Sequence, residues 1–119
     1  MNDTRLKFSV KGVLKNDRLY GLINEAHDLL GDVVGSSGPD VEDAWSVEKD
    51  SKGRPLILLK LSDFKGRAEA KFAPDELENP RQMSYRLIRL WGDVLQDRSH
   101  KQLAEMMDEQ GSEDAANGS

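Results

Sequence analysis

The spacing of the apolar residues changes its period three times along this chain, and this alternation limits the fold more than any other feature. Apolar and polar residues alternate over 6–10, which is typical of a half-buried strand. Apolar residues then recur at steps of three and four over 19–33, which is typical of an amphipathic helix. Strand-like patterns return over 42–72 and helical spacing over 87–95. The sequence therefore predicts the order β-α-β-β-β-α.

The middle of the chain contains three expected strands separated by two turns. The turns are the polar, glycine-containing segments 50–55 and 62–66. We expect an α+β two-layer sandwich, with two amphipathic helices packed on one face of a four-stranded, mainly antiparallel sheet. The first helix could carry the first strand across to lie parallel to a later strand.

Capping residues mark the starts of both helices. Asn16 or Asp17 can cap the first. Asn79 can cap the second, with Pro80 at the first helical position and Gln82 able to bond back to the cap. The apolar stripe of the second helix includes Ile88. The residues expected to face the sheet are Leu19, Leu22, Ile23, Ala26, Leu29, Leu30, Leu87, Trp91, Val94 and Leu95.

The charge distribution separates one domain from a tail. The chain of 119 residues has a net charge of −5, and residues 108–119 contain four acids and no Lys or Arg. Without this segment the chain has 17 basic and 18 acidic residues. We expect a single domain over 1–107 and a disordered acidic tail over 108–119.

The sequence offers no catalytic constellation. It has no cysteine, no Gly-x-Ser-x-Gly elbow, and two histidines, His27 and His100, which nothing in the sequence brings together. Asp40, Glu42 and Asp43 lack the spacing of a calcium loop and are interpreted as a solvated loop. We therefore predict no enzyme activity, no catalytic residue, no metal site and no cofactor. Without an apolar run suited to a signal peptide or a membrane span, we expect the cytoplasm and no membrane partner.

A protein contact is the leading functional hypothesis. On the strand 56–61, Ile57, Leu59 and Leu61 point one way, and Leu56 and Leu58 point the other. If the first set faces the helices, Leu56 and Leu58 form a small apolar patch on the open face of the sheet. Such a module would bind another protein or form a weak homodimer.

Basic residues on the strands give an RNA-binding alternative. Backbone phosphates are the natural partner of such a set. Glu48 and Glu69 are expected on the same face, which lacks the aromatic pairs that stack bases. The candidate nucleic-acid contacts are Arg5, Lys7, Lys11, Lys60, Arg67 and Lys71.

The order β-α-β-β-β-α over 5–107 resembles that of the ribosome hibernation family, which implies an RNA- or ribosome-associated accessory protein. That family lines its second helix with basic residues, whereas here the acids Asp93, Asp97 and Glu105 share the helix with the bases. The α-β-β-β-α segment is also similar to a double-stranded-RNA-binding domain, without the Lys-Lys cluster of that domain's final helix. A small enzyme is the third hypothesis.

Overall fold

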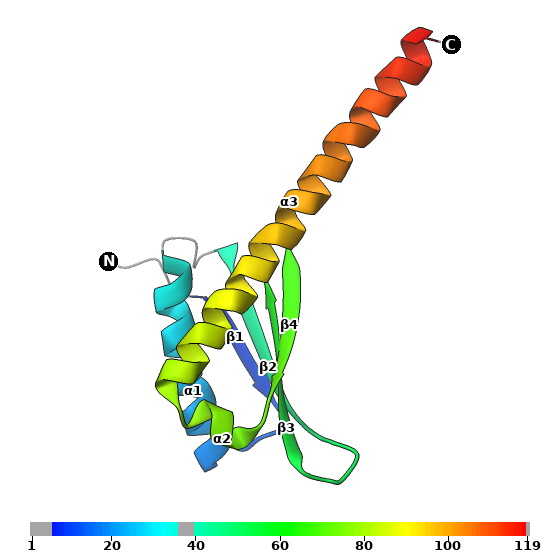
Figure 1. The fold of residues 1–119 in the computed structure, drawn as a ribbon. Coiled ribbons are helices and arrows are strands. Elements are labelled where there is room, and N and C mark those ends of the chain that lie inside the picture. Colours follow the sequence, from blue (N-terminus) through cyan, green and yellow to red (C-terminus); the bar gives the residue numbers. More distant parts are fainter. Residues whose placement is uncertain (1–5, 36–39, 119) are drawn as a thin grey trace.

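The computed structural model describes residues 6–35 and 40–118, and the surroundings of side chains as far as Asp108. The expected element order is confirmed, with one short helix added (Figure 1). The elements, in chain order, are β1 (Lys7–Lys11), α1 (Arg18–Val34), β2 (Glu42–Lys49), β3 (Pro55–Ser62), β4 (Arg67–Phe72), α2 (Pro74–Leu77) and α3 (Pro80–Gly118).

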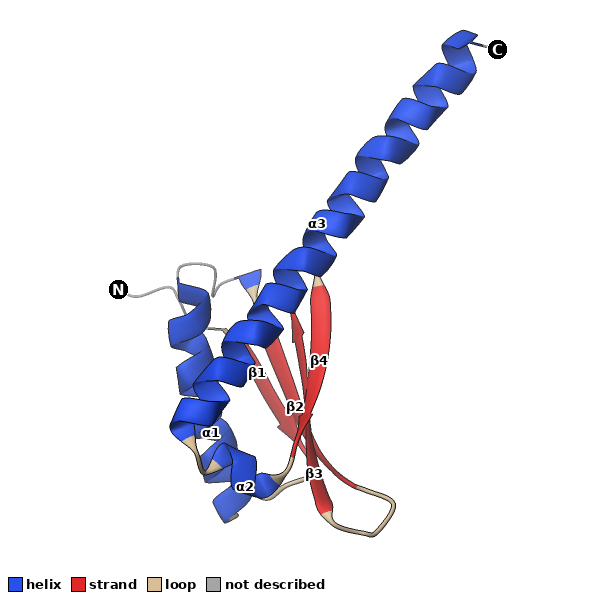
Figure 2. Cartoon of the chain, viewed as in Figure 1, coloured by secondary structure: helices blue, strands red, loops and turns tan. Residues whose placement is uncertain are grey.

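The four strands form one mixed sheet in the order β1-β2-β3-β4. β1 is parallel to β2, and the pairs β2–β3 and β3–β4 are antiparallel. Helices α1 and α3 lie side by side on one face of this sheet, so the molecule has two layers (Figure 2). The predicted sandwich is confirmed, and α1 carries the chain to β2, which lies parallel to β1.

The core lies between the sheet and the two long helices. Ile57, Leu59 and Leu61 are fully buried there, so this set of β3 side chains faces the helices, a choice that the sequence had left open. The core contribution of α3 differs from expectation. Met83 and Leu90 are buried, Trp91 and Leu95 are only partly buried, and Ile88 is exposed.

Local interactions explain where the elements begin. Asp17 caps α1 by accepting the backbone N–H of Leu19 at 2.8 Å. Asn79 accepts the backbone N–H of Gln82 at 3.2 Å, as expected for the cap of α3. After β1, Gly12 has φ +84°, and a Cβ there would lie 2.4 Å from the carbonyl oxygen of Val47. Only glycine fits this position without displacing β2.

Helix α3 makes the molecule elongated. It has 39 residues and extends well past the sheet (Figure 1). The radius of gyration is 18.0 Å, whereas a compact chain of this length has about 13–14 Å. The helix continues through 108–118, whereas the composition of this segment led us to expect disorder. That expectation stays a prediction. Within the described residues, no helix combines the length and apolar character needed to cross a membrane.

Candidate functional site

The first half of α3 is anchored to the sheet by one apolar face. Met83, Leu87, Leu90 and Val94 are each at most 3% exposed. Their spacing of four, three and four residues places them on one side of the helix. Arg86 adds a polar contact at the edge, because its guanidinium lies 4.3 Å from the centre of the Phe72 ring and bonds Glu76 at 2.5 Å. This inner face explains why α3 lies on the sheet.

The turn between β3 and β4 holds the middle of α3. Asp63 folds the turn, because one carboxylate oxygen accepts the backbone N–H groups of Lys65 and Gly66 at 2.9 and 2.6 Å. Its other oxygen accepts from Arg98 of α3 at 2.8 Å, although the Asp63 side chain is only 1% exposed. A Cβ at Gly66 would lie 2.2 Å from the carbonyl oxygen of Val94, so glycine allows the helix to pass this close.

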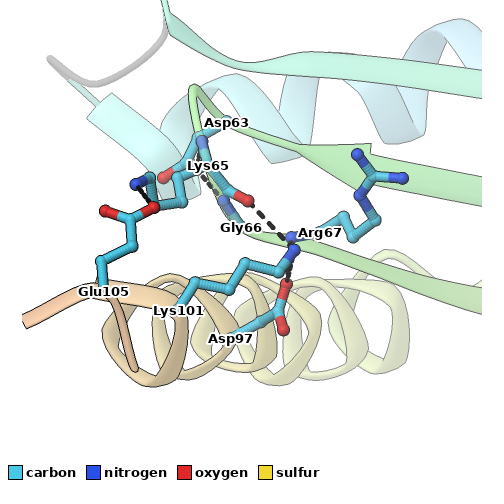
Figure 3. Close-up of polar contacts among 7 residues, drawn as sticks. All are labelled: Asp63, Lys65, Gly66, Arg67, Asp97, Lys101 and Glu105. Atoms are coloured by element: carbon cyan, nitrogen blue, oxygen red, sulfur yellow. Dashed lines mark hydrogen bonds and ion pairs between the residues drawn. The ribbon is translucent and has the colours of Figure 1, made fainter. Parts of the chain in front are cut away.

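A second set of contacts extends this attachment along the helix (Figure 3). Asp97 accepts the backbone N–H of Arg67 at 2.8 Å and pairs with Lys101 at 2.7 Å. The bond from Lys101, with that from the Arg67 backbone, holds the pKa of Asp97 below its ordinary value. Lys101 also donates to the carbonyl oxygen of Lys65 at 3.1 Å, and Lys65 pairs with Glu105. The helix is therefore held as far as Glu105.

The opposite side of α3 carries large apolar side chains that are exposed. Tyr85, Ile88, Leu103, Met106 and Met107 are between 54% and 67% exposed. In an α-helix these five positions fall within an arc of about 100°, opposite the inner face. We call these five residues the outer stripe. They are five of the seven large hydrophobic residues that are exposed in the described part of the chain.

Charge is unevenly distributed along α3. Residues 80–101 contain five bases and two acids, whereas 102–119 contain five acids and no base. Arg86, Arg98 and Lys101 pair with acids of the same chain. Arg81 and Arg89 are exposed, and neither makes an ion pair within the residues described. The sequence of α3 therefore has a basic first half and an acidic second half.

The open face of the sheet carries the basic residues that sequence reasoning selected. One row across the four strands consists of Lys7, Glu42, Ser62 and Arg67. In the next row on this face, Lys60 lies beside Glu69. A third row runs Lys11, Ser46, Leu58 and Lys71. The five lysine and arginine side chains are exposed, and within the described residues none makes an ion pair. Arg5 lies outside the described residues.

The predicted apolar patch on this face is small. Leu56 is partly exposed, and Leu58 is only 8% exposed. Ser46 and Lys71 flank Leu58 in its row, and Glu48 is opposite Leu56. At the other end of the face lies a shallow hollow of about 620 Å³ that is lined partly by Glu42, Lys60, Arg67 and Glu69. Because acidic and basic side chains both line the hollow, it does not favour a ligand of one charge.

A buried polar cluster joins α1 to the sheet, and sequence reasoning missed it. Asp43 is fully buried in β2, so the expectation of a solvated loop at this residue is wrong. Its Oδ2 lies 2.7 Å from Nδ1 of His27 and accepts the indole N–H of Trp45 at 2.8 Å. The bond to Asp43 raises the pKa of His27 above its ordinary value of 6.5. The His27 ring stacks on Phe8 at 4.1 Å.

The sequence did contain a signal for this cluster. Val41, Asp43, Trp45 and Val47 alternate, which places Asp43 on the apolar face of β2. A carboxylate at such a position needs a hydrogen-bonding partner, because burying an isolated charge is costly. Oδ1 of Asp43 has no partner among the described atoms. The cluster links β1, α1 and β2 and serves the fold. In the part of the chain described, no three ligand-type side chains gather as a metal site.

Known proteins give no further guide to the site. No protein-family model matches the chain, no curated protein matches it in sequence, and no solved structure matches its fold. The resemblance to the ribosome hibernation family therefore stays one of element order, and the function must be argued from the surfaces described above.

Proposed function

We propose that this chain is a non-catalytic protein-interaction module and that the outer stripe of α3 is its contact surface. The observation that supports this most is the alignment of five large, exposed apolar side chains along one helix face. These side chains form two clusters on that face, and exposed apolar clusters of this kind often mark protein contact sites. Covering the exposed parts of five such side chains would contribute about 4–9 kcal/mol, which is enough to offset much of the cost of association.

The open sheet face supports a protein contact less well. Leu58 is nearly covered, and Leu56 alone adds little apolar area. The charged pairs in the remainder of the domain hold the fold together, as Asp63 with Arg98 and Asp43 with His27 illustrate. We therefore place the contact on α3 rather than at Leu56 and Leu58.

The cytoplasm is the compartment we propose, because the chain has no cysteine.

Photo-crosslinking in the native cell tests this proposal. A photoreactive amino acid would replace Ile88 or Met106 on the stripe and, as controls, Asp93 or Ala104, which are exposed elsewhere on α3. We expect protein adducts from the two stripe positions and few from the controls. Equal labelling at all four positions, or no protein adduct at the stripe, would contradict the proposal.

A second candidate function is RNA binding by the open sheet face. The favouring observation is that Lys7, Lys11, Lys60, Arg67 and Lys71 share this face without an ion pair among the described residues. Phosphate binding by such cations falls steeply with salt. We expect the triple change Lys7→Glu, Lys60→Glu and Lys71→Glu to abolish any RNA binding seen at low salt. Absence of RNA binding by the wild-type chain at low salt would remove this candidate.

A further inference from the structure

We infer that the partner of the outer stripe is a second copy of this chain, bound with the two α3 helices antiparallel. This inference rests on the proposed function and names the partner of the same surface. It combines the exposed apolar side chains of α3 with the unequal charge of its two halves. Both features favour an antiparallel pair of helices.

The apolar side chains form two clusters that match each other in an antiparallel pair. Tyr85 and Ile88 form the first cluster, and Leu103, Met106 and Met107 form the second, about 28 Å further along the helix. A two-fold axis near Gln96 sets Tyr85 opposite Met107 of the other copy and Ile88 beside Leu103. The same contacts recur on the other side of the axis, as a symmetric interface requires.

The charges favour the same direction. Residues 80–101 have a net charge of +3, and residues 102–119 have a net charge of −5. An antiparallel pair brings each basic half beside an acidic half, whereas a parallel pair sets like charges together. Arg81 and Arg89 are exposed without an ion pair among the described residues, so they are available to the partner's acidic segment.

The charge order is unfavourable for α3 on its own. The first turn of α3 contains no acid and the last turn no base, although a helix dipole favours acids at the start and bases at the end. Arg81 lies near the start of the helix, and Glu113 and Asp114 lie near its end. An antiparallel partner offsets both mismatches, because its own charges and its dipole run the opposite way.

Gly92 lies between the two clusters and also fits this arrangement. Glycine weakens a helix relative to alanine. Nothing in the described part of the chain requires glycine there, because a Cβ at Gly92 would meet no described heavy atom within 4 Å. A partner helix crossing close to Gly92 gives this residue a role. The outer stripe lies opposite the inner face that is buried on the sheet, so a second α3 can approach from the side away from the strands.

Two measurements on the full-length chain test the inference. Light scattering across a concentration series should show a reversible change from monomer to dimer. Because the chain has no cysteine, single-cysteine variants can report the direction of the helices. Tyr85→Cys and Met107→Cys alter exposed positions. When the two variants are mixed and oxidised, we expect a disulfide between the different variants and little between identical ones.

Three outcomes would overturn the inference. The first is a wild-type chain that stays monomeric at high concentration, and the second is a disulfide formed only between identical variants, which indicates a parallel pair. The third is a dimer whose cysteines form no disulfide in any combination, which places the interface elsewhere. If the chain is monomeric while the photo-crosslinks from Ile88 and Met106 reach a different protein, this inference fails and the proposed function stands. Without either crosslinks or a dimer, both fail.

Discussion

The two faces of α3 carry similar residues and have opposite environments. Met83, Leu87, Leu90 and Val94 on the inner face are nearly inaccessible, whereas Ile88 and Leu103 on the outer stripe are more than half exposed. The sheet explains the apolar character of the inner face, and nothing in the described part of the chain does the same for the outer stripe. The comparison teaches that an apolar helical position can serve the fold or a partner, and that burial distinguishes the two.

The largest expected effect comes from the neighbours Leu87 and Ile88, of which the first belongs to the inner face and the second to the outer stripe. Leu87 is fully buried, so Leu87→Ala should lower the free energy of unfolding by about 2–5 kcal/mol. Ile88→Ala should change it by less than about 0.5 kcal/mol in the monomer, because Ile88 is exposed. Urea unfolding at low protein concentration measures both. Similar losses for the two variants would contradict the assignment of the faces.

Two glycines test the difference between the two faces of α3, because one packs against the helix backbone and the other lies in open space. Gly66→Ala should destabilise by about 1–3 kcal/mol, because its Cβ would clash with the backbone of Val94. Gly92→Ala should stabilise the monomer by up to about 1 kcal/mol, because the added Cβ meets open space in an exposed helix. Thermal unfolding at low concentration compares them. A stable Gly66→Ala variant would mean that the turn does not hold α3 as described.

The two histidines provide a pH test of the buried cluster. The pKa of His27 is raised in the fold, so its stabilising contribution is complete below pH 6.5 and is lost as the pH rises through the folded pKa. Stability measured against pH should fall over this range in the wild type and in His100→Gln. The same fall in His27→Gln would contradict the assignment.

The smallest effect on monomer stability is expected from removing residues 108–119. Helix α3 is held by contacts as far as Glu105, and the removed segment contains little apolar surface. Unfolding of the shortened chain at low concentration should match that of the full chain within about 0.5 kcal/mol. A larger loss would show that this segment belongs to the fold. The dimer should weaken, because the segment contributes four of the five acids in the acidic half of α3.

Sequence patterns predicted the two layers and the order of the elements but could not choose between the faces of α3. Leu87, Ile88, Trp91, Val94 and Leu95 all fit a helical stripe, yet neighbours such as Leu87 and Ile88 point about 100° apart. Only the packing of α3 on the sheet decides which of them is buried. The later positions Leu103 and Met106 continued the pattern, but the sequence did not show that the helix runs on past the sheet.

The buried cluster escaped prediction for a different reason. Alternation along β2 places Asp43 on the apolar face, but its partner His27 lies on α1, 16 residues earlier. No local pattern connects a helix residue to a strand residue at that separation. The basic open face was predictable, because Lys7, Lys60 and Lys71 depend only on strand alternation, and their shared exposure follows from the register.

Sedimentation equilibrium of the full-length chain with two matched variants tests the central claim most directly. Met106→Lys places a charge on the outer stripe, and Ala104→Lys places the same charge on another exposed side of α3. We expect a concentration-dependent dimer for the wild type and Ala104→Lys, and an affinity lower by about tenfold or more for Met106→Lys, because the charge would be buried at an apolar contact. A monomeric wild type, or equal affinities for the two variants, would contradict the account.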